Sequence, residues 1–402
     1  MDFITVKHAE NIIAKEIFRT KIIEKPLLGA LHYYSGESVY APIDVPPFDN
    51  SAMDGYAFAF QDYADKKEIT VRYTIQAGDT ELPILQSGEA ARIFTGAMIP
   101  EGADTVAMQE RTKVENSTLL IEEHAFDKGQ NIRPKGSQSK KNDLILEKNT
   151  LINPGTIGML AGFGIDKIKV FSFPKAGIIV TGNELAEAGE PLKKGQIYDS
   201  NAVTLQAALK AIHIDSVFSI KIKDDKNSTF EAIKQNLETA DVLLITGGIS
   251  VGDYDFVKES LEKSGVEKLF YKVQQKPGKP FFFGKKENHF VFALPGNPAS
   301  VLVCFYRYVQ PFLEGLKGNV NPFGNKTTAR LSGDFNKKDN LTHLLKGFLQ
   351  NDGTVTVLSG QESYKMDAFV QANCLVEISG EKRKYVKDEK VIVWKFDLKY
   401  SI

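Results

Sequence analysis

The sequence contains very little cysteine. Its 402 residues include only two, Cys304 and Cys374, which lie far apart and match no metal-ligand spacing. So few cysteines are typical of a chain from a reducing compartment, and both are predicted to be core residues. The six histidines are scattered, so the sequence has no zinc-binding pattern and gives no support to a catalytic triad built on a nucleophile and a histidine.

An excess of charge and a long apolar run are also missing. The net charge of -1 argues against a nucleic-acid-binding surface spread over the whole molecule, so any anion site must be local. No apolar run is long enough to cross a bilayer, and the first residues lack the basic, apolar and small-residue regions of a signal peptide. We therefore expect a cytoplasmic protein with neither a nucleic-acid nor a membrane partner.

The length of the chain, 402 residues, is too great for one hydrophobic core, and its texture predicts a multidomain α/β plus β protein. Residues 41–146 carry short apolar runs broken by Gly, Pro and Asp, which predict a β-rich domain. Residues 1–40 and 147–172 are predicted to form one small, discontinuous α/β domain. Residues 173–324 are predicted to form a central α/β domain, and residues 325–402 a barrel-like β domain.

The first helix is predicted to begin after Thr5, a suitable N-cap, because apolar residues follow at helical spacing through Ile17. Pro26 is expected to mark the end of this helix. A short helix and a strand are predicted within residues 147–172, where they would pack back on the first segment.

Strands and helices alternate in the central domain, so we expect a parallel or mixed sheet covered by helices in three layers. Apolar or alternating runs predict strands at residues 176–180, 218–222 and 242–246. Local signals predict that helices open at residues 199–201, at a capping box of Ser228 and Glu231, and at Asn297-Pro298, the last continuing to about Leu313.

Glycines follow the third of these strands. Ligands of open α/β sheets bind beyond the carboxyl ends of the strands, where the loops converge. Gly247, Gly248 and Gly252 would let backbone N–H groups approach an anion, and a helix starting near Asp253 would point its positive end at the same place. Phosphate is the predicted guest, although such a turn is also typical of a tight connection with no ligand.

Acids stand at the ends of three strands. Glu184, Asp224 and Asp255 could together hold Mg²⁺ against a substrate phosphate, because magnesium prefers carboxylate oxygens. Each acid also has a structural interpretation. Asp224 or its neighbour Asp225 would terminate a strand, and Asp255 would be a first-turn helix acid favoured by the helix dipole.

Two basic loops complete the polar pattern. Lys276 and Lys279 flank a Pro-Gly turn just downstream of Lys272, which suits them to balance phosphate charge. A solvated basic turn is the alternative interpretation. The second loop, residues 130–136, is predicted to lie on the surface.

Residues 47–57 follow no period of 2 or 3.6, although they include two carboxylates, an amide, a hydroxyl, a methionine and a glycine. A loop that presents side chains to a ligand is therefore predicted. Asp54-Gly55 is a turn signal, and Gly55 is expected to supply a positive φ. An ordinary surface turn is the alternative.

Seven stretches resemble, in order along the chain, the molybdopterin molybdenumtransferase family of the bacterial MoeA type, which is similar to the E domain of gephyrin. The most specific is Ser-Ala-Met-Asp-Gly-Tyr within residues 46–57. The others are residues 92–97, 100–104, 129–133, 247–255, 276–280 and 294–298. Together they span essentially the whole chain.

The resemblance implies a homodimer of four-domain subunits whose central domain is of the molybdopterin-binding type. Such an enzyme takes adenylylated molybdopterin and molybdate, cleaves the phosphoanhydride with Mg²⁺, and releases AMP and molybdenum cofactor. In the family the site lies between the α/β domain of one subunit and the β-rich domain of the other. Molybdopterin adenylyltransferase is a further candidate partner.

The family's functional positions fall on residues that the polar pattern already singled out. The implied catalytic residues are Asp54, Thr95, Glu184, Asp224, Asp255, Lys272 and Lys276. The implied binding residues are Gly247, Gly248, Ser250, Gly252, Lys279, Pro295 and Pro298. The implied metal ligands are Glu184, Asp224 and Asp255.

The chain departs from the family pattern at two places. Gln138 stands where relatives carry an acid, and Met366-Asp367-Ala368 stand where they often carry serines. Two other functions therefore stay open. The α/β domain alone also resembles molybdopterin adenylyltransferase, and a nonenzymatic binding scaffold, as in the E domain of gephyrin, is the third candidate.

Overall fold

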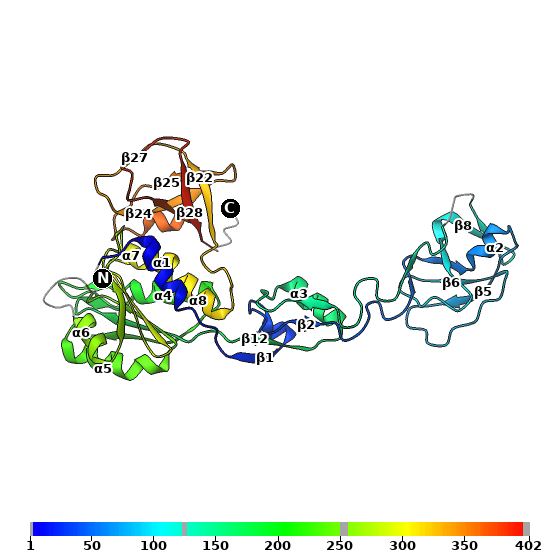
Figure 1. Ribbon diagram of the computed structural model, residues 1–402, viewed down its shortest axis with the longest axis horizontal. Coiled ribbons are helices and arrows are strands. Elements are labelled where there is room, and N and C mark those ends of the chain that lie inside the picture. Colours follow the sequence, from blue (N-terminus) through cyan, green and yellow to red (C-terminus); the bar gives the residue numbers. More distant parts are fainter. Residues whose placement is uncertain (1–2, 123–126, 250–255, 397–402) are drawn as a thin grey trace. The chain divides into compact units, whose positions relative to one another are not determined.

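The computed structural model describes residues 3–122, 127–249 and 256–396 (Figure 1). The chain forms two compact units. The first unit comprises Met1–Ile23, His32–Gly36 and Lys169–Ile402, and the second comprises Glu24–Leu31 and Glu37–Ile168. The finer division into four domains stays a prediction.

A six-stranded sheet forms the centre of the first unit. Its order is β16-β13-β17-β21-β20-β18. The strands are β13 (Ala176–Thr181), β16 (Ser216–Ile222), β17 (Val242–Thr246), β18 (Glu267–Tyr271), β20 (Phe282–Lys286) and β21 (His289–Leu294). The first four in this order are parallel, whereas β20 runs antiparallel to both of its neighbours. These directions confirm the prediction of a mixed sheet. Long apolar runs such as Val242–Thr246 are buried on both faces.

Helices cover both faces of this sheet (Figure 1). One face carries α1 (Val6–Lys15), α4 (Asn201–Ala211), α7 (Pro298–Cys304) and α8 (Gln310–Lys317), and the other carries α5 (Lys226–Asn236), η3 (Leu237–Thr239) and α6 (Phe256–Lys263). Successive strand residues point to opposite faces. Accordingly Leu244 packs in the core with Leu205 of α4, whereas Leu243 packs in the core with Ile233 of α5. The predicted three layers are confirmed.

Two helix ends differ from the sequence-based expectation. Helix α1 has its predicted N-cap, because the hydroxyl of Thr5 accepts a hydrogen bond from the His8 N–H. It ends at Lys15, however, and Pro26 is the last residue of β1 (Ile22–Pro26). Strand β1 pairs with β12 (Lys167–Phe171), so pairing with a strand distant in sequence overrides the proline signal.

Helix α5 is capped by Asp225 rather than by the predicted Ser228. The Asp225 carboxylate accepts hydrogen bonds from the backbone N–H groups of Asn227 at 3.1 Å and Ser228 at 2.9 Å. The free N–H groups at the start of the helix are therefore bonded by Asp225, three residues before Ser228. The predicted helix at Asn297 is confirmed at Pro298, and it continues through a π turn at Phe305–Val309 into α8, which ends at Lys317.

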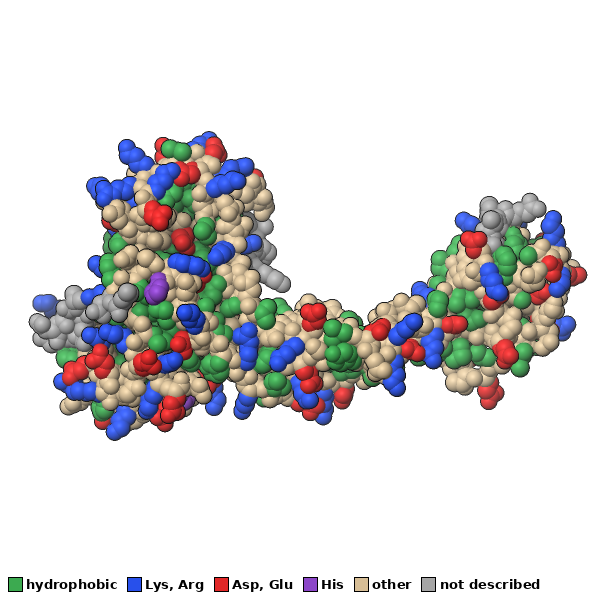
Figure 2. All heavy atoms as spheres, in the orientation of Figure 1, with side chains coloured by type: hydrophobic (Ala, Val, Ile, Leu, Met, Phe, Trp, Pro, Cys, Tyr) green, Lys and Arg blue, Asp and Glu red, His purple; other side chains and the backbone are tan. Residues whose placement is uncertain are grey.

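The C-terminal part of the first unit is a closed β-barrel, as predicted. Strands β24, β25, β22, β28 and β26 follow one another, and β26 pairs back with β24. The elements are β19 (Gln275–Lys276), β22 (Lys326–Leu331), β23 (Phe335–Asn336), β24 (Thr342–Leu349), β25 (Thr354–Val357), α9 (Asp367–Gln371), β26 (Cys374–Ile378), β27 (Lys384–Tyr385) and β28 (Lys390–Lys395). Lys and Arg side chains are interspersed with acids on the visible face (Figure 2).

Both cysteines are confirmed as core residues. Cys304 in α7 and Cys374 in β26 are fully buried and free. Burial raises the pKa of each thiol to about 12, so neither is a reactive thiolate at neutral pH.

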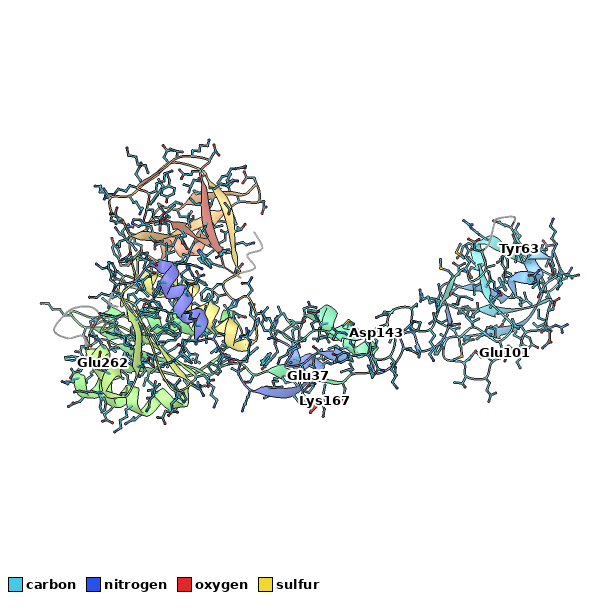
Figure 3. All side chains as sticks on the ribbon, viewed as in Figure 1. Glu37, Tyr63, Glu101, Asp143, Lys167 and Glu262 are labelled. Carbon is cyan, nitrogen blue, oxygen red and sulfur yellow. The ribbon has the colours of Figure 1, made fainter. Side chains whose placement is uncertain are left out.

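The second unit is built on another six-stranded sheet, ordered β7-β4-β6-β5-β9-β8. Its strands and associated helices are β4 (Gly55–Phe58), α2 (Phe60–Ala64), β5 (Thr70–Ile75), β6 (Glu89–Ile93), β7 (Thr105–Met108), η2 (Gln109–Arg111), β8 (Thr112–Glu115) and β9 (Thr118–Ile121). Apolar side chains pack on both faces. Tyr63 of α2, which is labelled in Figure 3, contacts Phe58 of β4 edge to face. The β-rich prediction for this region is confirmed.

Shorter elements complete the second unit. They are η1 (Leu27–Ala30), β2 (Val39–Tyr40), β3 (Asn50–Ser51), β10 (Ile132–Arg133), β11 (Leu144–Leu146) and α3 (Pro154–Gly162). Strand β2 pairs with β11, and β3 pairs with β10. The short helix predicted after residue 147 is therefore α3, and the predicted strand is β12. No helix within the described ranges combines the length and apolar character needed to cross a bilayer.

Candidate functional site

A pocket of about 370 Å³ opens where the central strands of the first unit end. The switch in strand order between β13, β16 and β17 creates this opening, because the connections leave β13 and β17 toward opposite faces of the sheet. The lining residues are Thr181, Glu184, Leu185, Ile197, Tyr198, Asp199, Ser200, Asn201, Asp224, Gly247, Gly248, Ile249, Pro280, Pro295, Gly296, Asn297 and Pro298. Ile197 and Tyr198 form β15 (Ile197–Tyr198), which pairs with β14 (Leu185–Ala186).

Two of the three predicted strand-end acids line this pocket. Asp224 is half-buried after β16, where its Oδ1 accepts a hydrogen bond from the Thr181 hydroxyl at 3.4 Å. Its backbone N–H donates to Oδ1 of Asn183 at 3.2 Å. Glu184, the residue after Asn183, is exposed. The segment at the end of β13 therefore contacts Asp224 and contributes a second carboxylate to the lining of the same pocket.

Gly247 and Gly248 form a wall of the pocket that side chains could not occupy. Both have positive φ, +92° and +59°. A Cβ on Gly247 would lie 2.6 Å from the Thr181 carbonyl oxygen, and one on Gly248 would lie 3.0 Å from Val257. A side chain at residue 247 would displace backbone and one at residue 248 would press on Val257, and both positions have the positive φ that favours glycine, so the main chain lines the pocket here.

Asn201 connects the remaining walls, and sequence patterns did not single it out as a site residue. Its Nδ2 donates to the Thr246 hydroxyl at 3.0 Å and to the Gly296 carbonyl oxygen at 2.8 Å. The Thr246 hydroxyl in turn donates to the Pro295 carbonyl oxygen at 3.0 Å. These partners lie 45 and 95 residues away, so no local signal could have found the contact.

The three predicted lysines are not among the residues that line the pocket, although Pro280 beside Lys279 is. The Lys276 Nζ lies 3.8 Å from Oδ2 of Asp339. The Lys272 Nζ lies 5.2 Å from the centre of the Tyr271 ring, and the Lys279 Nζ lies 5.1 Å from that of Phe3. Their role toward phosphate stays a prediction.

Three further predicted residues, Ser250, Gly252 and Asp255, lie outside the described residues, together with the predicted helix start near Asp253. Within residues 3–122, 127–249 and 256–396, no group of three or more His, Cys, Asp or Glu could hold a metal ion. Of the predicted metal ligands, the described part contains Glu184 and Asp224, which both line the pocket.

Asp54 and Thr95, predicted from separate motifs, meet in the second unit. Oδ1 of Asp54 accepts hydrogen bonds from both the backbone N–H and the hydroxyl of Thr95, each at 2.8 Å. These bonds, that from the backbone first, lower the pKa of Asp54. Asp54 is therefore an ionised, fixed carboxylate at neutral pH.

The neighbouring Gly55 has another role than the one expected. It has no positive φ. A Cβ at this position would lie 2.0 Å from the carbonyl oxygen of Ala107, across the pairing of β4 with β7. Close approach of two backbones explains the glycine.

The basic loop at residues 130–136 is more than a surface loop. Its Ile132 and Arg133 form β10, which pairs antiparallel with Asn50 and Ser51 of β3. The loop thus supports the start of the segment that carries Asp54.

Comparisons with known proteins cover the chain from end to end. The N-terminal region of MoeA (domains I and II) matches residues 4–164, a probable molybdopterin binding domain matches residues 177–315, and the C-terminal region of MoeA (domain IV) matches residues 328–396. The molybdopterin molybdenumtransferase of Haemophilus influenzae is 36% identical, over 98% of this chain and 99% of its own. That of Staphylococcus aureus strain Mu50 is 33% identical, over 95% of this chain and 93% of its own.

The fold agrees with the sequence comparison. A crystal structure of the molybdopterin biosynthesis MoeA protein from Pyrococcus horikoshii superposes with a TM-score of 0.84, covers 99% of this chain and 100% of its own, and shares 30% sequence identity. This chain belongs to the molybdopterin molybdenumtransferase family, whose members are transferases of molybdenum cofactor biosynthesis.

Proposed function

We propose that this protein inserts molybdenum into adenylylated molybdopterin, using molybdate, and releases AMP and molybdenum cofactor. The observation that carries the proposal is the pocket at the ends of β13, β17 and β21, in which Glu184 and Asp224 stand beside the bare backbone of Gly247 and Gly248. Carboxylates and close-approaching backbone together suit a phosphate-bearing substrate. Relatives that span nearly the full chain carry this activity in their names.

The donor set fits Mg²⁺. Magnesium is commonly bound through one or two carboxylates together with substrate phosphates, and Glu184 and Asp224 supply such carboxylates. Bound Mg²⁺ would offset the negative charge on the anhydride and its leaving phosphate. Asp255 is proposed as a third ligand. Thr181 keeps Asp224 oriented, since its hydroxyl contacts Oδ1.

The remaining predicted residues have proposed binding roles. Pro295 and Pro298 shape the pocket wall, and the network from Asn201 through Thr246 holds their loop. Lys272, Lys276 and Lys279 would balance the charge of phosphate and molybdate. Ser250 and Gly252 are proposed to extend the glycine wall.

Asp54 and Thr95 are proposed to serve the same reaction from the other subunit of a homodimer. We propose that the reaction takes place in the cytoplasm, and that molybdopterin adenylyltransferase supplies its substrate.

The decisive experiment incubates purified protein with adenylylated molybdopterin, molybdate and Mg²⁺, and measures AMP release and active cofactor. Asp224→Asn should lower turnover by about 100-fold or more, because the neutral amide loses the metal-directed charge. Glu262→Gln is the matched control. Glu262 lies on α6 (Figure 3), is half exposed and does not line the pocket. Its carboxylate makes a long ion pair with Lys258, at 3.9 Å.

The same assay separates the two rival functions. Adenylylation of molybdopterin from ATP, without AMP release from the adenylylated form, would identify an adenylyltransferase. An inert protein that folds and dimerises normally would support the binding scaffold. Unchanged turnover of Asp224→Asn would remove Asp224 from the proposed site.

A further inference from the structure

Asn201 is buried in the wall of the pocket with only part of its hydrogen-bonding capacity used. It is the first residue of α4, lines the pocket, and is 9% exposed. Its Nδ2 makes two hydrogen bonds, to Thr246 and to Gly296. Within the described part of the chain, its Oδ1 is buried and has no hydrogen-bonding partner.

The orientation of this amide follows from its neighbours. The Gly296 carbonyl oxygen can only accept a hydrogen bond, so the atom 2.8 Å from it must be the NH₂ group of Asn201. The Thr246 hydroxyl donates its proton to Pro295, so toward Asn201 it can only accept. Both contacts therefore require the NH₂ group on this side, and the carbonyl oxygen on the other.

An unused buried acceptor is costly, because burial removes its hydrogen bonds to water. In a pocket wall, such an atom is a ready partner for a donor on a bound molecule. The start of α4 does not compete for an anion here. Oδ1 of Asp199 already accepts from the backbone N–H groups of Asn201 at 2.9 Å and Ala202 at 3.1 Å. The ligand group that contacts Oδ1 of Asn201 is therefore a hydrogen-bond donor, and it differs from the phosphate.

We propose that Oδ1 of Asn201 accepts a hydrogen bond from an N–H or O–H group of the adenylylated pterin, making Asn201 a substrate-binding residue. This inference rests on the proposed function. Two parts of that substrate carry suitable donors, namely the adenosine and the pterin. The same side chain fixes the Pro295 loop, so it couples recognition of one substrate group to the position of the wall around it.

The test compares Asn201→Ala with Thr246→Val by titration calorimetry. Thr246→Val keeps the shape of residue 246 and the side-chain carbonyl of Asn201, and it removes the bond from residue 246 to Pro295, while the bond from Asn201 to Gly296 remains. It therefore measures the cost of loosening the loop when the Asn201 acceptor is retained. Asn201→Ala should weaken binding of AMP or of molybdopterin by about tenfold beyond Thr246→Val, as expected for a lost hydrogen bond to a buried acceptor. Thermal unfolding of both variants checks that they fold.

The ligands distinguish the two sources of the donor. Loss of affinity for AMP alone assigns the contact to adenosine. In that case purine ribonucleoside monophosphate, which lacks the 6-amino group, should bind Asn201→Ala and the unaltered protein equally if that amino group is the donor, and a persisting difference assigns a ribose hydroxyl. Loss of affinity for unadenylylated molybdopterin alone assigns the contact to the pterin.

The outcomes also separate this inference from the function on which it rests. Normal turnover of the unaltered protein, with Asn201→Ala and Thr246→Val binding both ligands equally well, would overturn the role of Asn201 and leave the reaction in place. Failure of the unaltered protein to bind either ligand would overturn both proposals.

Discussion

Oδ1 of Asp54 accepts two hydrogen bonds from Thr95, one from the backbone N–H and one from the hydroxyl, each at 2.8 Å. The two residues are 41 positions apart. Because β4 and β6 are neighbours in the sheet, the loop before β4 and the loop after β6 meet at one edge. The geometry fixes a charged carboxylate on an otherwise irregular segment.

Thr95→Val should raise the pKa of Asp54 toward its ordinary value, since the hydroxyl bond is lost while the backbone bond remains. A carboxyl whose pKa is lowered by folding adds stability above its unfolded pKa, and this stability is lost as pH falls through the folded pKa. The variant should therefore be less stable than the unaltered protein at neutral pH, and the difference should vanish in acid. Carboxyl-carbon NMR titration and denaturation at several pH values measure both effects.

Asp54→Asn is the control for this titration. With no titrating group at position 54, adding Thr95→Val should change stability equally at every pH. A pH-dependent difference in the Asp54→Asn background would show that another group responds.

Gly55→Ala should destabilise the second unit by about 3 kcal/mol or more, because the new Cβ would overlap the Ala107 carbonyl oxygen at 2.0 Å. Gly158→Ala should do the opposite. Gly158 lies within α3, and a Cβ there has no neighbour within 4 Å. Alanine in a helix interior is favoured by about 0.5–1 kcal/mol. Urea unfolding followed by circular dichroism compares the two, and equal effects would contradict the steric explanation.

Arg307→Met should lower the free energy of unfolding of the first unit by about 3–5 kcal/mol, because it leaves Glu10 buried without its main partner. Arg307 is 1% exposed and its Nη2 lies 2.6 Å from Oε2 of Glu10. Burial raises the pKa of Glu10, but Arg307 and Lys7 outweigh it and lower the value overall. Adding Glu10→Gln should therefore recover part of the loss.

The guanidinium of Arg307 also stacks 3.7 Å from the centre of the Trp394 ring. Since Trp394 is the one tryptophan of the chain, its fluorescence reports on this contact directly. Arg307→Met should shift the native emission spectrum and the urea midpoint together. An unchanged midpoint would mean that Arg307 contributes nothing to the stability of the first unit.

Subunit mixing tests the proposal that Asp54 acts on the partner's pocket. Asp54→Ala and Asp224→Asn should each be inactive as homodimers. A heterodimer of the two, isolated with different tags, should recover about half of the normal AMP release, because one of its two sites combines only unaltered parts. If each chain completed its own site, the heterodimer would contain no intact site and would stay inactive.

The sequence by itself predicted β13, β16 and β17 of the central sheet, and a run such as Val242–Thr246 is apolar at every position because it is buried on both faces. It also determined that Asp224, Gly247 and Pro295 follow strand ends, and a shared edge of a parallel sheet brings such positions together. The sequence also predicted a ligand-facing loop around Asp54, since neither a strand nor a helix explains its polar residues.

Only the tertiary structure decided which residues distant in sequence contact one another. Asn201 contacts Thr246 and Gly296 across many residues of chain, Gly55 is a glycine because Ala107 lies against it, and Pro26 ends a strand because β12 pairs beside it. Periodicity and capping signals are local, whereas these contacts exist only after distant segments have packed. The sequence therefore determines which chemical groups are present, and the fold determines which residues they contact.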